Sequence, residues 1–251
     1  MENIINPFFE ITLKDSLAII KIKRDVFKLL KSKDDIDLLF NSLRLLHSDI
    51  TIKALLFINT PECYGEKAYD NFVKDSISLI KKDRFGEPVD FWNSNERYKE
   101  NQILDNFVKY LSNYNKLSFT ILSGEIVTPI FSASLATDIR YATPDMYFSL
   151  AHNKYGMHPS GGLPHFLIQQ VGFNKAMELL FTERITAEKA LELGLINKIV
   201  SIDNTLDIVL NDIEKITKFP NAVLRRTKKL SNYIRNSLAD YFTYEASLWN
   251  L

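Results

Sequence analysis

The sequence predicts an α/β protein built on a mainly parallel sheet, and two observations carry that prediction. Short continuous apolar runs, Ala54 to Ile58 and Leu117 to Leu122, have the length and composition of buried strands. Segments with helical spacing of apolar residues precede both runs. Because strands alternate with helices, we expect a sheet with helices packed on it and a site in the loops at the strand ends.

The chain opens with a predicted hairpin. Apolar residues alternate with polar ones over Glu10 to Arg24, on both sides of a turn at Lys14 to Ser16. A helix follows from an N-cap at Asp34 or Asp35. Its apolar positions are Ile36, Leu39, Phe40, Leu43 and Leu46. The order strand, strand, helix, strand therefore ends at the first apolar run.

The segment between the two apolar runs is less regular. Pro and Gly predict a loop over Pro61 to Asp70. The charged region from Ser76 to Asn101 has no clear period, so we interpret it as an irregular, partly mobile excursion. An amphipathic helix over Ile103 to Tyr114 then leads into the second run.

The C-terminal part of the chain predicts helices only, apart from a short apolar run at Leu195 to Val200. The predicted helices are Pro164 to Val171, Asn174 to Phe181, Thr186 to Gly194, Asn221 to Asn236 and Ser237 to Leu248. An apolar helix so late in a chain often packs on another subunit.

Composition excludes several classes of function. Lys plus Arg and Asp plus Glu both total 31, so no overall field attracts nucleic acid or an anionic membrane. Cys63 is the only cysteine, which excludes an internal disulfide and fits a reducing compartment. No segment approaches the length of a membrane span or the pattern of a signal peptide. We therefore expect a cytoplasmic protein without nucleic-acid or membrane partners.

One stretch, Ser123 to Leu167, holds the dense cluster of residues that suit a ligand site. Small residues around Gly124 let main-chain N–H groups approach a ligand closely. A helix opening at Pro164 would point further N–H groups into the same space. His152, His158 and His165 do not have the spacing of a metal cluster, so we predict no metal.

Three motifs stand out in the second half of the chain: ATDIRYATPDMYF, GMHPSGG and VGFNKAMELLFTERITAEKALELGLINKIV. Together they resemble the enoyl-CoA hydratase/isomerase, or crotonase, superfamily. The match runs without gaps from about Lys116 to Val200, and Pro220 to Leu251 resembles the closing helices of the family. The N-R-P-x-x-x-N signature of the family is not recognisable, although CYGEKAYD stands where the family has F-x-A-G-A-D.

The resemblance implies a fold and an assembly. The fold is a crotonase-like spiral of strand–strand–helix units over residues 1–200, with a C-terminal helical trimerisation region over 201–251. Members of the family form trimers or dimers of trimers (hexamers) and bind acyl-CoA thioesters. The CoA or carrier-protein moiety of the substrate would be the only cofactor.

The resemblance also implies an oxyanion hole made of two backbone N–H groups, which would stabilise a thioester enolate. These are the N–H groups of Ala68 and of residue 129. Residue 129 is Pro129, which has no N–H. The second donor is then missing unless Thr128 or Ile130 presents its own N–H.

Two glutamates that activate water in hydratases are replaced here by Ser132 and His152. His152 is either a general acid or base, since imidazole titrates near neutral pH, or a loop histidine with ordinary hydrogen bonds. Ser132 is either a nucleophile or, without a G-x-S-x-G elbow, a small packing residue. Glu66 and Glu125 are carboxylates that either lie near the pocket or are solvated. Asp138 matches a structural aspartate of the family.

Further positions suggest where the ligand binds. Tyr64, with Tyr69 and Tyr155, either borders an acyl tunnel or belongs to the core. Lys67 lies beside the implied oxyanion donor. In the family a lysine near residues 228 and 229 reaches the CoA phosphate, so Lys228 and Lys229 are candidates, with a solvated helix face as the alternative.

Two hypotheses on function follow. The first is an enzyme of lyase or isomerase type that acts on an acyl-thioester by isomerisation, dehydration, decarboxylation or hydrolysis, but not by two-glutamate hydration. The second is a catalytically degenerate oligomeric scaffold or thioester-binding module, which Pro129 and the missing glutamates favour.

Overall fold

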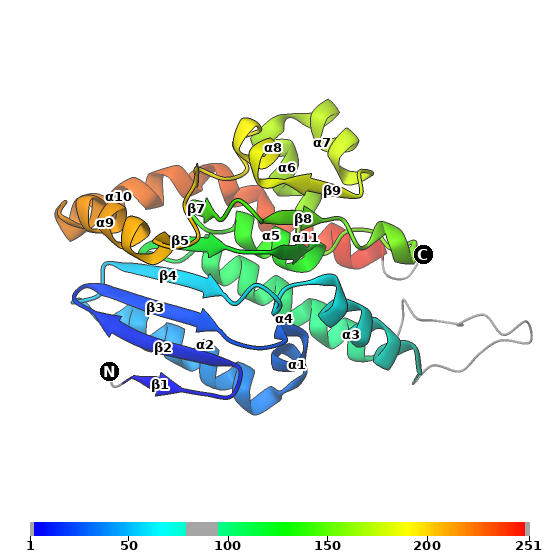
Figure 1. The fold of residues 1–251 in the computed structure, drawn as a ribbon, viewed down its shortest axis with the longest axis horizontal. Helices are drawn as coiled ribbons and strands as arrows, with labels where there is room; N and C mark the ends of the chain where they lie inside the picture. The colour runs from blue at the N-terminus through cyan, green and yellow to red at the C-terminus, as the bar shows by residue number, and fades with distance from the viewer. Residues whose placement is uncertain (1–2, 79–94, 249–251) are drawn as a thin grey trace, which may run out of the picture.

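The larger of two sheets forms the base of the molecule. A computed structural model describes residues 3–78 and 95–248. The strands of this sheet, in spatial order, are β1 (Ile4–Ile5), β2 (Phe9–Lys14), β3 (Leu17–Ile22), β4 (Ala54–Asn59), β5 (Leu117–Leu122), β7 (Ile139–Ala142) and β10 (Lys198–Ile199). Pairing is antiparallel from β1 to β3 and parallel from β3 to β10, which confirms the predicted fold class (Figure 1).

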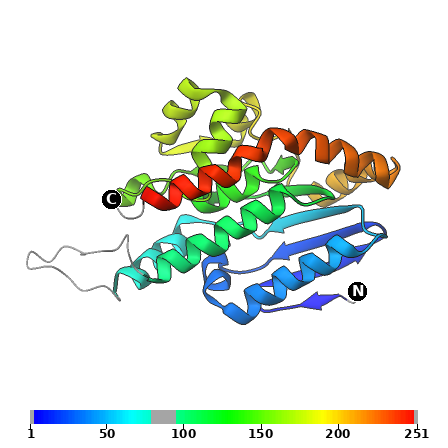
Figure 2. The same ribbon diagram turned by 180° about the vertical axis from the view of Figure 1, so that it is seen from behind.

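Both faces of this sheet are buried, which explains why β4 is apolar throughout. Leu55 and Phe57 point into the main core, on the face covered by α2 (Lys33–Ser48) and α4 (Asn95–Ser112) (Figure 2). Leu56 points to the other face, where α9 (Thr205–Thr217) packs. The alternation of side chains along a strand divides one apolar run between two layers.

A second, smaller sheet lies beside β7 and carries the candidate site. It consists of β6 (Glu125–Val127), β8 (Tyr147–Ser149) and β9 (Arg184–Thr186), with the order β6-β8-β9. Helix α5 (Thr128–Leu135) follows β6 without a break, and the 3₁₀ turn η2 (Asn153–Tyr155) follows β8. Helices α6 (Leu163–Val171), α7 (Phe173–Leu180) and α8 (Ala187–Glu192) cover this end (Figure 1).

The C-terminal helices return to the sheet. They are α10 (Asn221–Ser231), the 3₁₀ segment η3 (Asn232–Ser237) and α11 (Leu238–Ser247). Helix α11 runs antiparallel beside α4 (Figure 2), where Lys109 Nζ lies 4.6 Å from the centre of the Phe242 ring. The C-terminal helices are therefore packed on the core within one chain.

Several elements differ from the prediction. The expectation of helices in the C-terminal part is wrong at Arg184–Thr186, where β9 pairs with β8. The short apolar run that was set apart, Leu195 to Val200, contains β10, which pairs with β7. The loop predicted over Pro61 to Asp70 ends at Gly65, where α3 (Glu66–Ser78) begins. Helix α1 (Val26–Lys31) was not predicted, because it is too short to show a period. The Asp25 carboxylate caps its start by accepting hydrogen bonds from the N–H groups of Phe27 and Lys28.

The irregular excursion predicted over Ser76 to Asn101 falls largely on residues 79–94, outside the described residues. Its last part is helical, because α4 begins at Asn95. Among the helices of residues 3–78 and 95–248, none has the length and apolar composition needed to span a bilayer.

Candidate functional site

The start of α3 forms one edge of the site, and the Glu125 carboxylate occupies one of the free N–H groups there. The first helical hydrogen bond of α3 runs from the Tyr69 N–H to the Gly65 carbonyl, so the N–H groups of residues 66–68 have no partner within the helix. The Glu66 N–H donates to Glu125 Oε2 at 2.7 Å. A Cβ at Gly65 would lie 2.9 Å from that oxygen, which explains the glycine. The N–H groups of Lys67 and Ala68 remain for a ligand.

Both carboxylates near this edge are held by the protein. Glu125 also accepts the Tyr147 hydroxyl at 2.8 Å, and Glu66 accepts the Ser149 hydroxyl at 2.5 Å. Glu66 lies 3.6 Å from the exposed amine of Lys154. These carboxylates therefore bind the small sheet to α3, which is the structural alternative to a catalytic role.

The start of α5 is the opposite edge. All eight residues of this helix are buried, and Pro129 occupies its second position. The Val127 N–H before the helix is used by the Tyr64 carbonyl, at 3.0 Å. Since Pro129 has no N–H, only Thr128 and Ile130 carry first-turn N–H groups without a partner inside the helix.

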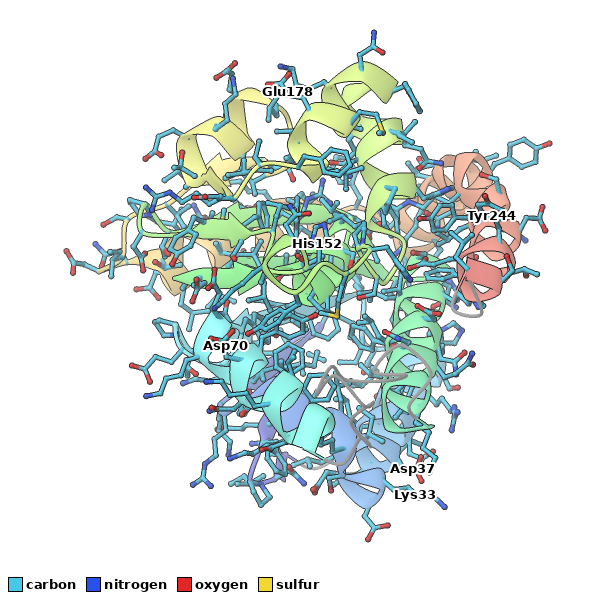
Figure 3. The ribbon with its side chains drawn as sticks, turned by 90° about the vertical axis from the view of Figure 1, so that its right-hand side faces the viewer. Lys33, Asp37, Asp70, His152, Glu178 and Tyr244 are labelled. Atoms are coloured by element: carbon cyan, nitrogen blue, oxygen red, sulfur yellow. The ribbon has the colours of Figure 1, made fainter. Side chains whose placement is uncertain are left out.

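His152 lies in the interior, at 2% exposure, next to α5 (Figure 3). Its Nδ1 atom is 2.8 Å from the hydroxyl of Thr128, and the Leu180 carbonyl accepts a further hydrogen bond from the ring. Burial, with a smaller contribution from His158, lowers the pKa of His152 to about 4. The ring is therefore neutral at pH 7 and holds the first residue of α5.

Ser132 is also fully buried, on the face of α5 that meets the loop before α6. Its Oγ atom lies 2.9 to 3.2 Å from the carbonyl oxygens of Thr128, Pro129 and Ser160. A Cβ at Gly161 would lie 2.6 Å from this oxygen. These three contacts and the tight approach of Gly161 fit the packing role that was the alternative to a nucleophile.

An apolar cavity of about 80 Å³ lies between the two helix starts and the sheet. Tyr64, two residues before α3, and Ile130, the third residue of α5, both line it. The other lining residues are Ile22, Val26, Leu29, Leu30, Ile36, Leu39, Phe57, Leu104, Phe107, Leu111, Thr120, Leu122, Ala133, Ser134 and Thr137. The cavity is suited to a small apolar group.

The three tyrosines predicted to border an acyl tunnel lie in different surroundings. Tyr64 lines the cavity. Tyr69 packs against Phe27, with ring centres 5.1 Å apart, and Tyr155 donates its hydroxyl to Asp70 on α3. Figure 3 shows Asp70 on α3 and His152 near the centre of the molecule. Lys67 is exposed at the start of α3, beside the buried Ala68.

The two candidate lysines of α10 lie in opposite environments. Lys228 is buried, 2.8 Å from the Asp138 carboxylate, and donates to the Lys116 carbonyl at 2.7 Å. Asp138 also accepts the Ser118 N–H at 2.7 Å, in agreement with its structural role in the resemblance. A lysine held in this way does not reach a phosphate, so Lys228 is removed from the candidate ligand contacts.

Lys229 lines an open groove of about 730 Å³ with Arg225 and Arg226. The remaining lining residues are Asn113, Tyr114, Asn115, Ala222, Asn232 and Tyr233, so the described lining has cationic side chains and no acidic one. Within the described part of the chain, no three His, Cys, Asp or Glu side chains lie close enough together to hold a metal ion.

Sequence reasoning missed the partner that fixes His152. Thr128 and His152 are 24 residues apart and meet because β6 and β8 pair in parallel, with Val127 opposite Ser149. Strands of three residues give no recognisable period, so the sequence contains no signal for this contact. The cavity was missed for a similar reason, since it is formed by α1, α2, α4, α5 and the sheet together.

Known proteins resemble this chain in both sequence and fold. The model of the family "Enoyl-CoA hydratase/isomerase" matches residues 93–250. A protein of Arabidopsis thaliana named "Probable enoyl-CoA hydratase 1, peroxisomal" is 32% identical over 112 residues, which are 44% of this chain and 42% of that protein. A Delta(3,5)-Delta(2,4)-dienoyl-CoA isomerase of Pyricularia oryzae is 31% identical over 97 residues, 38% of this chain and 34% of that one. The chain thus spans less than half the length of these two relatives.

The solved enoyl-CoA hydratase of Bacillus halodurans superposes with a TM-score of 0.73 at 17% identity, over 96% of this chain and 92% of that one. At this identity the likeness shows the fold alone. The family model covers more than half of the chain and includes α5, β7 and the C-terminal helices. The chain belongs to the enoyl-CoA hydratase/isomerase family.

Proposed function

We propose that the protein binds an acyl-thioester and polarises its carbonyl group with backbone N–H groups at the starts of α3 and α5. The observation that carries this proposal is the apolar cavity, which adjoins both helix starts through Tyr64 and Ile130. The acyl chain would occupy the cavity, and the thioester oxygen would face the N–H groups of Ala68 and Ile130. Negative charge on that oxygen is stabilised by such fixed donors, each worth roughly 3 to 4 kcal/mol.

This arrangement supports enolate-type chemistry, such as isomerisation, dehydration, decarboxylation or hydrolysis. Two-glutamate hydration does not fit, because Ser132 and His152 stand at the positions of the two glutamates and both are buried and hydrogen bonded. We assign His152 a positioning role: it holds Thr128 and so the start of α5. A general base works best when its pKa lies near the working pH, whereas that of His152 is about 4.

We further propose that the groove beside Lys229 binds the phosphate groups of the thioester carrier, whether CoA or a carrier protein. The support is the group of three cationic side chains, Arg225, Arg226 and Lys229, in a chain with no net charge. Such a groove attracts phosphate strongly at low salt.

The test of this function measures binding and chemistry separately. Crotonyl-CoA should raise the unfolding temperature, because a ligand that binds only the folded state stabilises it. Butyryl-CoA in D₂O should exchange its α-protons with solvent water, as detected by mass spectrometry. Water at the helix starts would take up the proton, because the described lining of the cavity has no carboxylate or imidazole. Ala133→Leu, which fills the cavity, should abolish both effects, whereas Ala239→Leu on the exposed side of α11 should abolish neither.

The non-catalytic module is a second candidate because Pro129 removes a donor and none of the described residues that line the cavity is acidic. Binding of crotonyl-CoA without any α-proton exchange would favour the module. Absence of binding at all would overturn both candidates.

A further inference from the structure

We infer that the acyl group is short and uncharged, with about four carbons including the thioester carbonyl. This inference rests on the proposed function, since it assumes that the cavity between α4 and α5 receives the acyl chain. It concerns the substrate class that this chain accepts.

The volume of the cavity sets the length. A dry apolar cavity of about 150 Å³ holds a benzene molecule, which has six carbons. The cavity here measures about 80 Å³, roughly half of that volume. It therefore holds about three carbons beyond a carbonyl group placed at the helix starts.

Leu111, near the end of α4, and Thr137, two residues after α5, both line the cavity. Segment η3 joins the ends of these two helices, because Asn232 donates to the Ser112 carbonyl at 2.7 Å and Arg235 donates to the Ala136 carbonyl at 3.0 Å. We place the inner end of the acyl site here, so that a longer chain would have to displace the buried Leu111 side chain.

The lining excludes an acyl group with a second carboxylate. No Lys, Arg or His belongs to the described lining, so a buried carboxylate would have no partner and its transfer from water would be strongly unfavourable. Two of the lining hydroxyls are already used, since Ser134 donates to the Phe131 carbonyl and Thr137 to the Ser134 carbonyl, both at 2.6 Å. The lining thus favours an apolar or neutral group.

The experiment compares saturated CoA thioesters from acetyl to octanoyl, with free CoA as the baseline and succinyl-CoA as the four-carbon acyl group that carries a charge. We expect affinity to rise roughly fourfold per methylene up to butyryl, and to fall for hexanoyl and octanoyl. Succinyl-CoA should bind no better than free CoA. Tighter binding of octanoyl than of butyryl, or equal binding of succinyl and butyryl, would overturn the inference.

A variant makes the length limit explicit. Leu111→Ala should move the optimum from butyryl to hexanoyl, whereas Leu43→Ala, at a buried position of α2 outside the cavity, should lower stability and keep the butyryl optimum. An unchanged optimum in Leu111→Ala would remove Leu111 as the end of the acyl site. If no thioester binds better than free CoA, the proposed function itself fails, which is a different outcome from a wrong chain length.

Discussion

Pro129 removes one hydrogen-bond donor from the first turn of α5, at the position next to the cavity-lining Ile130. If this turn faces the thioester oxygen, a residue with an N–H at position 129 adds a donor. We therefore expect Pro129→Gly to raise the rate of α-proton exchange by about a hundredfold, and to lower stability by about 1 kcal/mol.

A matched control is Pro164→Gly, because Pro164 also occupies the second position of a helix, α6, but lies outside the cavity lining. It should lose a similar amount of stability with no gain in exchange. If Pro129→Gly exchanges α-protons no faster than Pro164→Gly and the wild type, the start of α5 does not face the thioester.

Two substitutions of His152 test whether its buried ring transfers protons or positions the start of α5. His152→Ala removes the hydrogen bond to Thr128, displaces the start of α5 and should lower exchange by about a hundredfold. His152→Gln has both a donor and an acceptor, so it can keep contacts with Thr128 and the Leu180 carbonyl. We expect Gln to retain most of the exchange rate and a flat pH profile between pH 6 and pH 8. Equal loss in both variants would instead assign His152 to proton transfer.

At the scale of elements, the buried ion pair between Lys228 and Asp138 joins α10 to the start of β7. Removing one partner leaves a buried charge without compensation, which costs about 3 to 5 kcal/mol. Lys228→Met should therefore lower the unfolding temperature by roughly 10 °C. Lys229→Met, one residue away in the open groove, should leave that temperature unchanged and weaken CoA binding. Equal unfolding temperatures of Lys228→Met and Lys229→Met would contradict the structural role of the Lys228–Asp138 ion pair.

The contact between α4 and α11 predicts a dependence of stability on pH. Glu245 accepts the Gly162 N–H at 3.2 Å and is 3% exposed, and Asp105 of α4 is 8% exposed. Burial, with repulsion between the two carboxylates, raises the pKa of Glu245 to about 8, and burial raises that of Asp105 to about 7. The other charged or titratable groups that act on them are Lys109 of α4 and Tyr241 of α11.

Because these pKa values are raised on folding, the folded state prefers the protonated carboxyl groups. Their contribution to stability is present in full below about pH 4 and is lost as the pH rises through 7 and 8. Glu245→Gln keeps an acceptor for the Gly162 N–H but does not ionise. We expect it to be more stable than wild type at pH 9 and not at pH 4, in thermal unfolding. The exposed Asp240→Asn, on the same helix, should show no such difference.

At the scale of the whole molecule, an apolar stripe in the C-terminal part supports the predicted trimerisation region. Phe219, Val223 and Leu230 are 58%, 50% and 77% exposed and lie one or two turns apart on one side of α10 and its preceding turn. Exposed apolar patches mark interfaces. We propose a trimer or hexamer, and expect Val223→Ser with Leu230→Ser to dissociate it in sedimentation. Phe173→Ser, at another exposed apolar residue on α7, is the control. If only that substitution dissociates the oligomer, the interface lies on α7 and not on α10.

The overall fold followed from the sequence because buried parallel strands and amphipathic helices each have a strong period. The buried strand β4 is an example, and so is α2, whose apolar positions Ile36, Leu39 and Leu43 are all in the core. The short helix α1 and the three-residue strands β6 and β8 have no recognisable period and were missed. Because the site lies on these short elements, its contacts, such as that of Thr128 with His152, were not predictable.

The link from Lys228 to Asp138 also constrains the order in which the chain acquires its structure. The strands β2 to β7 leave the ribosome before residue 228 does, and until then the Asp138 carboxylate lacks its ion pair with the Lys228 amine. Lys228 further donates to the Lys116 carbonyl at the entry to β5, so a single late side chain completes two neighbouring strands. A chain stopped at residue 200, the boundary that the resemblance implies, would keep every described strand of this sheet but lose the Lys228 amine. We therefore expect residues 201–248 to act as an intramolecular folding partner of the sheet.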